Sequence, residues 1–338
     1  MELIRNMSGF ERWVRRWGLG TLVAALIAVA IGYYYNLRPN VTEAVLAAAI
    51  RHSTPLILGA LCGMMGERAG VINIGIEGQM LMAAFIGFLT NVWTGNLFIA
   101  VMAGVLTGAL LGLLLAFMSV TLKVDQIIGG TVINILALGL TGYFYTPGLV
   151  TQGKLVPFAL GRLADIPLFG TVFFVNPPIT YSTFILILLA HYVLFYTKWG
   201  LRTRAVGEHP RAADTLGINV FRMRYWNVII GGMFSGLAGA FLTLEAVGTF
   251  ERAMTNGRGF VALAVMIFGK YTPFGAWGAA LLFGFASALQ TQLQFGGQVN
   301  IPHQFIGMLP YILTIVVLAG FVGRTRIPAA DGIPYEKE

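Results

Sequence analysis

The sequence contains very little charge. Asp, Glu, Lys and Arg together make up 11% of its 338 residues, whereas soluble domains carry about 25%. A soluble chain of this length needs a polar surface over its core, and too few charged side chains are present to build one. Hydrophobic residue types make up 57% of the chain. A soluble fold is therefore excluded, and an all-α protein embedded in a membrane is expected.

The chain also lacks the motifs of several functional classes. Cys62 is its only cysteine, so no intrachain disulfide can form. There is no G-x-x-x-x-G-K-[ST] loop, which excludes a P-loop for ATP in this chain. The four histidines are scattered, and neither H-E-x-x-H nor G-x-S-x-G occurs. We therefore expect no catalytic residue, no metal site and no cofactor.

The net charge of +8 could suggest nucleic-acid binding. However, the Lys and Arg residues lie between apolar runs, where they orient membrane helices instead of forming a basic patch. Nucleic acid is therefore excluded as a partner, and membrane lipid is expected around the chain.

Ten apolar runs are candidates for transmembrane helices. The eighth is too short to cross as a regular helix, so it is expected to be tilted, broken or re-entrant. If the N-terminus is inside, most of the 22 Lys and Arg residues are also inside, which predicts that both termini are cytoplasmic. The expected spans are 19–36, 43–66, 71–92, 97–121, 126–146, 180–197, 226–249, 259–270, 274–294 and 304–322.

The expected membrane domain, 19–322, lies between a basic cytoplasmic segment, 1–18, and a cytoplasmic tail, 323–338. Two of its loops are long. Residues 147–179 are expected outside and are rich in Pro, Gly and aromatic residues, while residues 198–225 are expected inside and are basic.

Two pairs of segments resemble each other at similar separations. DQIIGGTVINIL at 125–136 resembles HQFIGMLPYILT at 303–314, and GERAGV at 66–71 faintly resembles NGRGFV at 256–261. Ten helices would then form two five-helix repeats, which insert in opposite orientations because five is odd. Chance similarity between apolar, glycine-rich segments is the alternative.

The stretch at 66–85, GERAGVINIGIEGQMLMAAF, places polar side chains and glycines in an apolar run. An ionised Glu77 at membrane depth is costly unless it faces the bundle interior or a wet cavity. Asn73 lies four residues before Glu77, on the same helical face, and Gln79 follows. We interpret the stretch as part of a path or a gate. The alternative is helix packing, with Glu77 paired to a basic residue such as Arg68.

Other apolar runs also carry polar side chains, among them Asn134 and Glu245. Residues 271–273 interrupt the stretch 258–294, and discontinuous helices often mark the substrate region of transporters. Gln290 lies beyond this break, although it could also sit at the lipid–water boundary. The expected substrate-path residues are Asn73, Glu77, Gln79, Asn134, Glu245 and Gln290.

The loop at 198–225 is predicted to contain a short helix. Pro210 can open it at its first turn, and Gly217 can end it. Such a helix suits a coupling contact with a partner ATPase, with a plain cytoplasmic loop as the alternative. The expected coupling residues are Gly207, Glu208, Pro210, Arg211, Ala212, Ala213, Leu216 and Gly217.

Four segments carry a family resemblance. They read RAGVINIGIEGQMLMAA, VDQIIGGTVIN, GLRTRAVGEHPRAADTLGIN, and GRGFVALAVMIFGKYTPFGAWGAALLFG followed by MLPYILT. In this order they resemble the permease subunits of bacterial ABC importers for nucleosides and simple sugars, with ribose and branched-chain amino acid permeases as more distant relatives. The match covers about residues 44 to 322 and implies a type II-like importer permease. It also implies that 207–219 is the loop that contacts the ATPase.

The resemblance further implies a machine of several chains in the bacterial cytoplasmic membrane. The expected partners are ABC ATPase subunits that use the ATP, a second permease chain and an extracytoplasmic substrate-binding protein. The second permease would be a different paralogue or another copy of this chain. Nucleosides are the expected substrate, moved by alternating access. Simple sugars such as ribose or galactose are the alternative, because Asp125–Ile128 stand where the nucleoside branch commonly has an N-E-V-I-like stretch.

Two other classes remain open. An ion- or proton-coupled secondary transporter would use Glu77 and Glu245 as proton carriers and would need no partner. A scaffold or receptor subunit would not transport at all.

Overall fold

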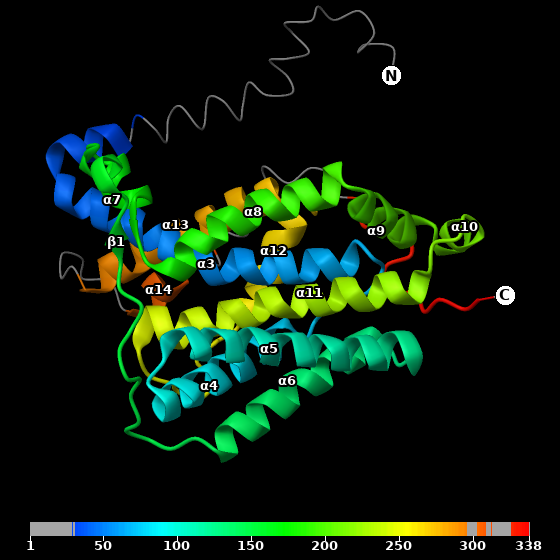
Figure 1. Cartoon of the computed structure of the whole chain (residues 1–338). Coiled ribbons are helices and arrows are strands. Elements are labelled where there is room, and N and C mark those ends of the chain that lie inside the picture. The colour runs from blue at the N-terminus through cyan, green and yellow to red at the C-terminus, as the bar shows by residue number, and fades with distance from the viewer. Residues whose placement is uncertain (1–28, 30, 296–302, 309–311, 313–325, 338) are drawn as a thin grey trace, which may run out of the picture.

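The computed structural model describes residues 29, 31–295, 303–308, 312 and 326–337. Nearly all of its regular structure is helical, and the long helices run side by side between two ends of the molecule (Figure 1). Six described helices are long and apolar enough to cross a membrane, which agrees with the architecture expected from composition. They are Pro39–Glu67, Leu97–Thr121, Gln126–Tyr143, Pro178–Tyr196, Val220–Val247 and Pro273–Gln294.

The elements follow one another without a large sheet. Helices α5 and α11 each continue into a π-helical stretch, over Phe117–Thr121 and Phe241–Val247. The elements are α3 (Pro39–Glu67), α4 (Ile76–Thr94), α5 (Leu97–Ala116), α6 (Gln126–Tyr143), β1 (Phe158–Ala159), a 3-10 turn (Gly161–Asp165), α7 (Phe169–Phe173), β2 (Val175–Asn176), α8 (Pro178–Tyr196), α9 (Lys198–Glu208), α10 (Pro210–Thr215), α11 (Val220–Ala240), α12 (Arg258–Phe268), α13 (Pro273–Phe295) and α14 (His303–Gly307). Strands β1 and β2 pair antiparallel, with Phe158 opposite Asn176.

Most of the expected spans correspond to helices with nearby bounds. The span 97–121 is α5 with its π-helical continuation, and 126–146 is α6. The span 259–270 is the short helix α12. The spans 19–36 and 304–322 lie largely outside the described residues, so ten crossings and two inverted repeats stay predictions.

One expected span begins too early. Helix α4 starts at Ile76 and not at residue 71. Gly70 has a φ of 83°, a left-handed conformation that a residue with a side chain adopts at a cost. The chain reverses at this point and enters α4 through the non-helical segment 71–75. The apolar pattern could not distinguish this buried connection from a first helical turn.

Helix α4 is packed between other helices of the described bundle. Twelve of its 19 residues are buried, whereas α5, which exposes one face, buries six of 20. Helices α5, α6, α11 and α12 all pack against α4. A helix surrounded in this way can hold polar side chains at membrane depth without exposing them to lipid.

Helices α5 and α11 approach each other through glycines. Gly104, Gly108 and Gly112 recur at four-residue intervals on α5 and face α11. A Cβ on Gly108 would lie 2.2 Å from the carbonyl oxygen of Gly232 and 2.6 Å from the Cα of Gly236. Small residues at this spacing allow two membrane helices to pack backbone against backbone.

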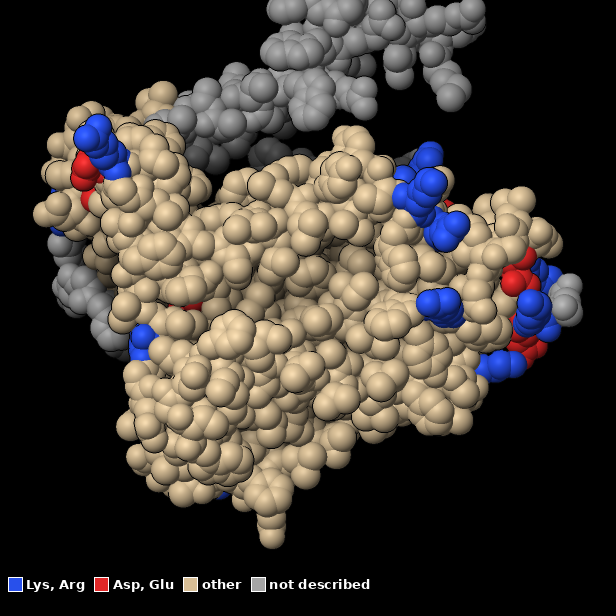
Figure 2. Space-filling model, in the orientation of Figure 1, with Lys and Arg blue, Asp and Glu red and all other residues tan. Residues whose placement is uncertain are grey.

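Charged side chains gather at the ends of the molecule. We call the end formed by α9, α10 and residues 326–337 the α10 end, and the end formed by α7, β1 and β2 the α7 end (Figure 1). Figure 2 shows Lys, Arg, Asp and Glu concentrated at the α10 end, with an uncharged belt between the two ends. Such a belt suits a surface that faces lipid. The loops 147–179 and 198–225 therefore lie at opposite ends.

Candidate functional site

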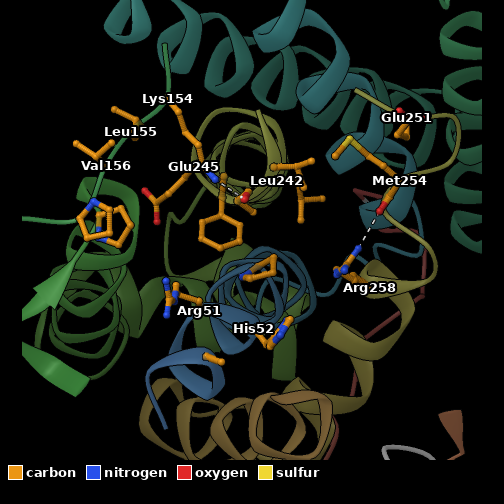
Figure 3. Close-up of a pocket in the computed structure, with 17 residues that line it drawn as sticks. Arg51, His52, Lys154, Leu155, Val156, Leu242, Glu245, Glu251, Met254 and Arg258 are labelled. Atoms are coloured by element: carbon orange, nitrogen blue, oxygen red, sulfur yellow. Dashed lines mark hydrogen bonds between the residues drawn. The ribbon is translucent and has the colours of Figure 1, made fainter. Parts of the chain in front are cut away.

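A cavity of about 570 Å³ lies between α3 and the end of α11, in the half of the molecule nearer the α7 end (Figure 3). We call it the α3–α11 cavity. Arg51 and His52 reach it from α3, Lys154 from the loop before β1, Glu245 from the end of α11 and Arg258 from the start of α12. Ionisable groups of both signs thus meet inside a largely uncharged bundle, where such groups usually mark a functional site.

A second cavity, of about 600 Å³, lies between α12 and α13. We call it the α12–α13 cavity. Asn256 and Gln290 contribute amides to its wall, and Phe260 contributes an aromatic ring. His52 and Arg258 line both cavities. The two cavities are therefore neighbours that share the side chains of His52 and Arg258.

Arg258 is held in place by the start of α12. Gly257 precedes this helix with a φ of 79°. The Glu77 carboxylate accepts hydrogen bonds from the backbone N–H groups of Gly257, at 2.8 Å, and of Gly259, at 2.6 Å. A carboxylate is favourable at a helix N-terminus because the first N–H groups have no partner within the helix. Arg258 itself donates from Nη1 to the Met254 carbonyl at 2.8 Å.

Glu245 has the corresponding role at the start of α8. Its carboxylate accepts from the Ile179 backbone N–H at 2.7 Å and from the Thr180 backbone N–H at 3.1 Å. The Thr180 hydroxyl donates a third hydrogen bond at 2.6 Å. Backbone and hydroxyl donors thus satisfy this buried carboxylate, and they hold α8 against the end of α11.

Asn73 and Gln79 belong to a buried polar cluster. Gln79 Oε1 accepts from the Ser235 hydroxyl at 2.9 Å and from Asn73 Nδ2 at 3.3 Å. Asn134 fastens α6 to the segment before α4, because its Nδ2 donates to the Ile74 carbonyl at 3.1 Å. These three residues are not among the described residues that line either cavity. Of the six expected substrate-path residues, Glu245 and Gln290 do line one.

The alternative pairing of Glu77 with Arg68 is wrong. Arg68 donates from Nε, at 3.2 Å, and from Nη2, at 2.8 Å, to the Tyr271 carbonyl in the turn between α12 and α13. Burial, followed by the nearby charge of Arg204, lowers the pKa of the Arg68 guanidinium. Arg68 thus fixes the break that residues 271–273 were expected to make.

The short helix expected within 198–225 is present as α10. It begins at Pro210, and Gly217 follows it with a φ of 79°. Ala213 is buried, whereas Leu216 is 81% exposed, so one of these apolar side chains packs inside the protein and the other faces the solvent. Gly207 is the last residue but one of α9, and a Cβ there would lie 2.3 Å from the Arg68 carbonyl oxygen.

Several polar residues that line the cavities were not among the expected site residues. Arg51, His52, Asn256 and Arg258 are examples. A signal for two of them existed, since Arg51 and His52 are adjacent polar residues inside an apolar run. Arg258 lies just before the expected span 259–270 and therefore resembled a loop residue. The turn that carries it toward the cavities depends on Glu77, which is distant in the sequence.

Comparison with known families gives a match over most of the chain. Residues 45–318 match the family described as the branched-chain amino acid transport system / permease component. The match spans the described bundle from α3 to α14 and includes both cavities.

Individual relatives are similar over nearly their whole length. The chain is 40% identical to the guanosine ABC transporter permease protein NupQ of Bacillus subtilis, over 88% of this chain and 98% of NupQ. It is 38% identical to the nucleoside ABC transporter permease protein NupC of Lactococcus lactis, over 88% of this chain and 98% of NupC. It is also 34% identical, over 87% of this chain and 97% of the relative, to TsgC13 of Haloferax volcanii, which is provisionally described as a glucose ABC transporter permease protein.

Proposed function

The chain belongs to the family of branched-chain amino acid transport system permease components, and we propose that it forms the nucleoside path of an ATP-driven importer. It is a multi-pass membrane protein and a transporter subunit, not an enzyme. The observation that carries the nucleoside assignment is the 40% identity to NupQ over 98% of that relative.

The chemistry of the cavities supports a nucleoside as cargo. A nucleoside is uncharged and offers an aromatic face together with several hydrogen-bonding groups. Phe260 supplies a ring in the α12–α13 cavity, and Asn256 and Gln290 supply amides. Pockets that combine apolar walls with a few placed polar groups suit such ligands. Simple sugars are the second candidate, because TsgC13 carries a glucose description at 34% identity.

The proposal also covers the other subunits of the importer. ATPase subunits, a second permease chain and an extracytoplasmic binding protein would act with this chain, which needs no cofactor of its own. The basic α10 end would face the cytoplasm, with both termini on that side, and residues 147–179 would meet the binding protein. Ten helices in two inverted five-helix repeats would rock around the cavities during alternating access.

Two sets of residues have proposed roles in this cycle. His52, Asn256, Arg258 and Gln290 would line the path, while Asn73, Glu77, Gln79, Asn134 and Glu245 would hold its walls through the hydrogen bonds described above. The α10 region would receive the force of ATP hydrolysis through Gly207, Glu208, Pro210, Arg211, Ala212, Ala213, Leu216 and Gly217.

The rival secondary transporter is less well supported. It needs Glu77 and Glu245 to release and take up protons during transport. Each carboxylate instead accepts two hydrogen bonds from backbone N–H groups at the start of a helix, which supports a structural role for both. A scaffold subunit that does not transport would not require the two cavities.

Uptake in cells tests the proposed substrate. The chain would be produced with its ATPase, second permease and binding protein in cells that lack their own nucleoside importers. We expect uptake of labelled guanosine that unlabelled nucleosides inhibit and that ribose, galactose and glucose leave unchanged. Uptake of a labelled sugar, unaffected by nucleosides, would overturn the nucleoside assignment and leave the importer class in place.

Gln290→Leu is expected to raise the KM for nucleoside uptake about tenfold, because a hydrogen bond lost at the path wall weakens binding by about 1.4 kcal/mol. The matched control is Gln292→Leu, which makes the same change two residues away at an exposed position of α13. Uptake kinetics of the two variants, corrected for the amount of protein in the membrane, provide the measurement. Equal KM values in the two variants would remove Gln290 from the path.

A further inference from the structure

The C-terminal tail, residues 327–337, is tied to α9 and α11 by hydrogen bonds that its own backbone makes. The Ala330 backbone N–H donates to the Gly207 carbonyl at 2.9 Å, at the end of α9. Arg224 of α11 donates from Nη1 to the Ile333 carbonyl at 2.9 Å. These contacts join the tail to the two helices that flank α10.

An aromatic side chain anchors the tail more firmly. Tyr335 is 7% exposed and lies in an apolar cluster with Val206 of α9, Ala213 of α10 and Val220 of α11. Its ring centroid is 5.4 Å from that of Phe221. Burying a large side chain of this kind contributes about 1.5–3 kcal/mol. Because Ala213 packs in the same cluster, the position of α10 depends on the tail.

The tail also reaches the segment that leads into α4. The Ala330 carbonyl oxygen would lie 2.9 Å from a Cβ on Gly70, and a Cβ on Gly332 would lie 2.8 Å from Ile72 Cδ1. Asp331 lies between these two contacts, and burial raises its pKa. The tail thus bridges α10 and the connection to α4.

A groove of about 540 Å³ separates the tail from α10. Pro210 and Arg211 line it on the helix side, and Ile333 and Pro334 line it on the tail side. Ile333 is 56% exposed, and Leu216 at the end of α10 is 81% exposed. Ile333 and Pro334 therefore give the groove an apolar wall, and a concave apolar surface of this kind suits contact with another protein.

The charge around this groove narrows the choice of partner. Arg211 and the acidic Glu336 both line the groove. Exposed basic residues outnumber exposed acidic ones on α9, α10, the start of α11 and the tail, at the end where Figure 2 shows charged side chains gathered. A partner with apolar side chains for the groove and an acidic rim would match the surface. The exposed basic residues on the three helices are Lys198, Arg202, Arg211 and Arg222.

We propose that the tail and α10 together form the surface on which the importer's ATPase subunit docks, with the tail as one wall of the groove. This inference rests on the proposed importer function. It adds a segment that the coupling loop alone does not contain, and it assigns Ile333 and Pro334 to the contact. Because the tail also touches Gly70 and Ile72, movement of the docked ATPase would reach the start of α4 directly.

Co-purification from the complete complex tests the proposal. We expect removal of residues 327–338 and, separately, Ile333→Glu to reduce the ATPase recovered with the permease about tenfold or more, while the second permease still co-purifies. The control is Lys337→Ala, which removes an exposed ion pair with Asp214 at 3.6 Å and should change recovery little. Full ATPase recovery with Ile333→Glu would overturn the proposal, even if the truncated chain failed to fold. If the unaltered chain recovers no ATPase, the importer function itself fails.

Cysteine labelling gives an independent readout. Cys62, the only cysteine, is buried, so Ile333→Cys would introduce an accessible thiol. We expect bound ATPase to slow its reaction with a maleimide about tenfold, and to leave unchanged the rate at Leu160→Cys, which is 42% exposed near the α7 end. An unchanged rate at Ile333→Cys in a complex that retains its ATPase would contradict docking at the tail.

Discussion

Gly108→Leu is expected to leave almost no folded permease in the membrane. At this position a Cβ would lie 2.2 Å from the carbonyl oxygen of Gly232 and 2.6 Å from the Cα of Gly236. Both obstacles are backbone atoms, so no rotamer change can relieve the clash and α5 must move away from α11. Overpacking a well-packed interface costs about 1–3 kcal/mol, occasionally more, and displaced helices cost at the upper end of that range.

Size-exclusion chromatography of detergent extracts, followed through a fluorescent fusion, measures this effect. The matched control is Gly139→Leu, which makes the same substitution on α6 at an exposed glycine whose Cβ would meet no atom within 4 Å. We expect the control to give a normal, symmetrical peak. Equal peaks from the two variants would show that the glycine contact between α5 and α11 does not set the helix packing.

Glu77→Ala is expected to abolish most uptake, because it removes both acceptors at the start of α12. The N–H groups of Gly257 and Gly259 would lose hydrogen bonds of 2.8 Å and 2.6 Å. Each hydrogen bond to a charged group contributes about 1.5–3 kcal/mol, so the start of α12 would loosen and Arg258 would leave its place beside the cavities. Uptake assays measure the loss of transport, and thermal melting of the purified complex measures the loss of stability.

Glu77→Gln separates this account from proton transport. A glutamine keeps one oxygen that can accept from one of the two N–H groups, so we expect uptake and melting temperature between those of the unaltered chain and Glu77→Ala. A proton carrier would behave differently, because glutamine cannot bind and release the proton. Complete loss of uptake in a Glu77→Gln protein of normal thermal stability would favour the secondary transporter.

The sequence predicted the helices because lipid restricts the possible structures. Apolar runs long enough to cross a bilayer become helices almost regardless of detail, and α10 was predicted because Pro210 and Gly217 act locally. The start of α4 was misplaced because segment 71–75, apolar except for Asn73, is largely buried without being helical. Its backbone is satisfied partly by Asn134, a partner 60 residues away.

The site was harder to predict because its residues also depend on partners that are distant in the sequence. The sequence showed that Glu77 had to be sheltered from lipid, but its partners lie 180 and 182 residues away. Backbone N–H groups carry no residue-type signal, so no pattern could point to Gly257 and Gly259. Gln290 was identified because an amide in an apolar helix is conspicuous, whereas Arg258 follows a polar turn and resembled an ordinary loop cation.

Transport by purified components in vesicles tests the central claim most directly. ATP would be enclosed inside the vesicles, with the ATPase subunits facing the interior. The binding protein and labelled guanosine would be added outside. The account predicts that guanosine accumulates only when ATP, the ATPase, both permeases and the binding protein are all present. Accumulation at full rate by this chain alone, driven by a pH gradient without ATP, would contradict it.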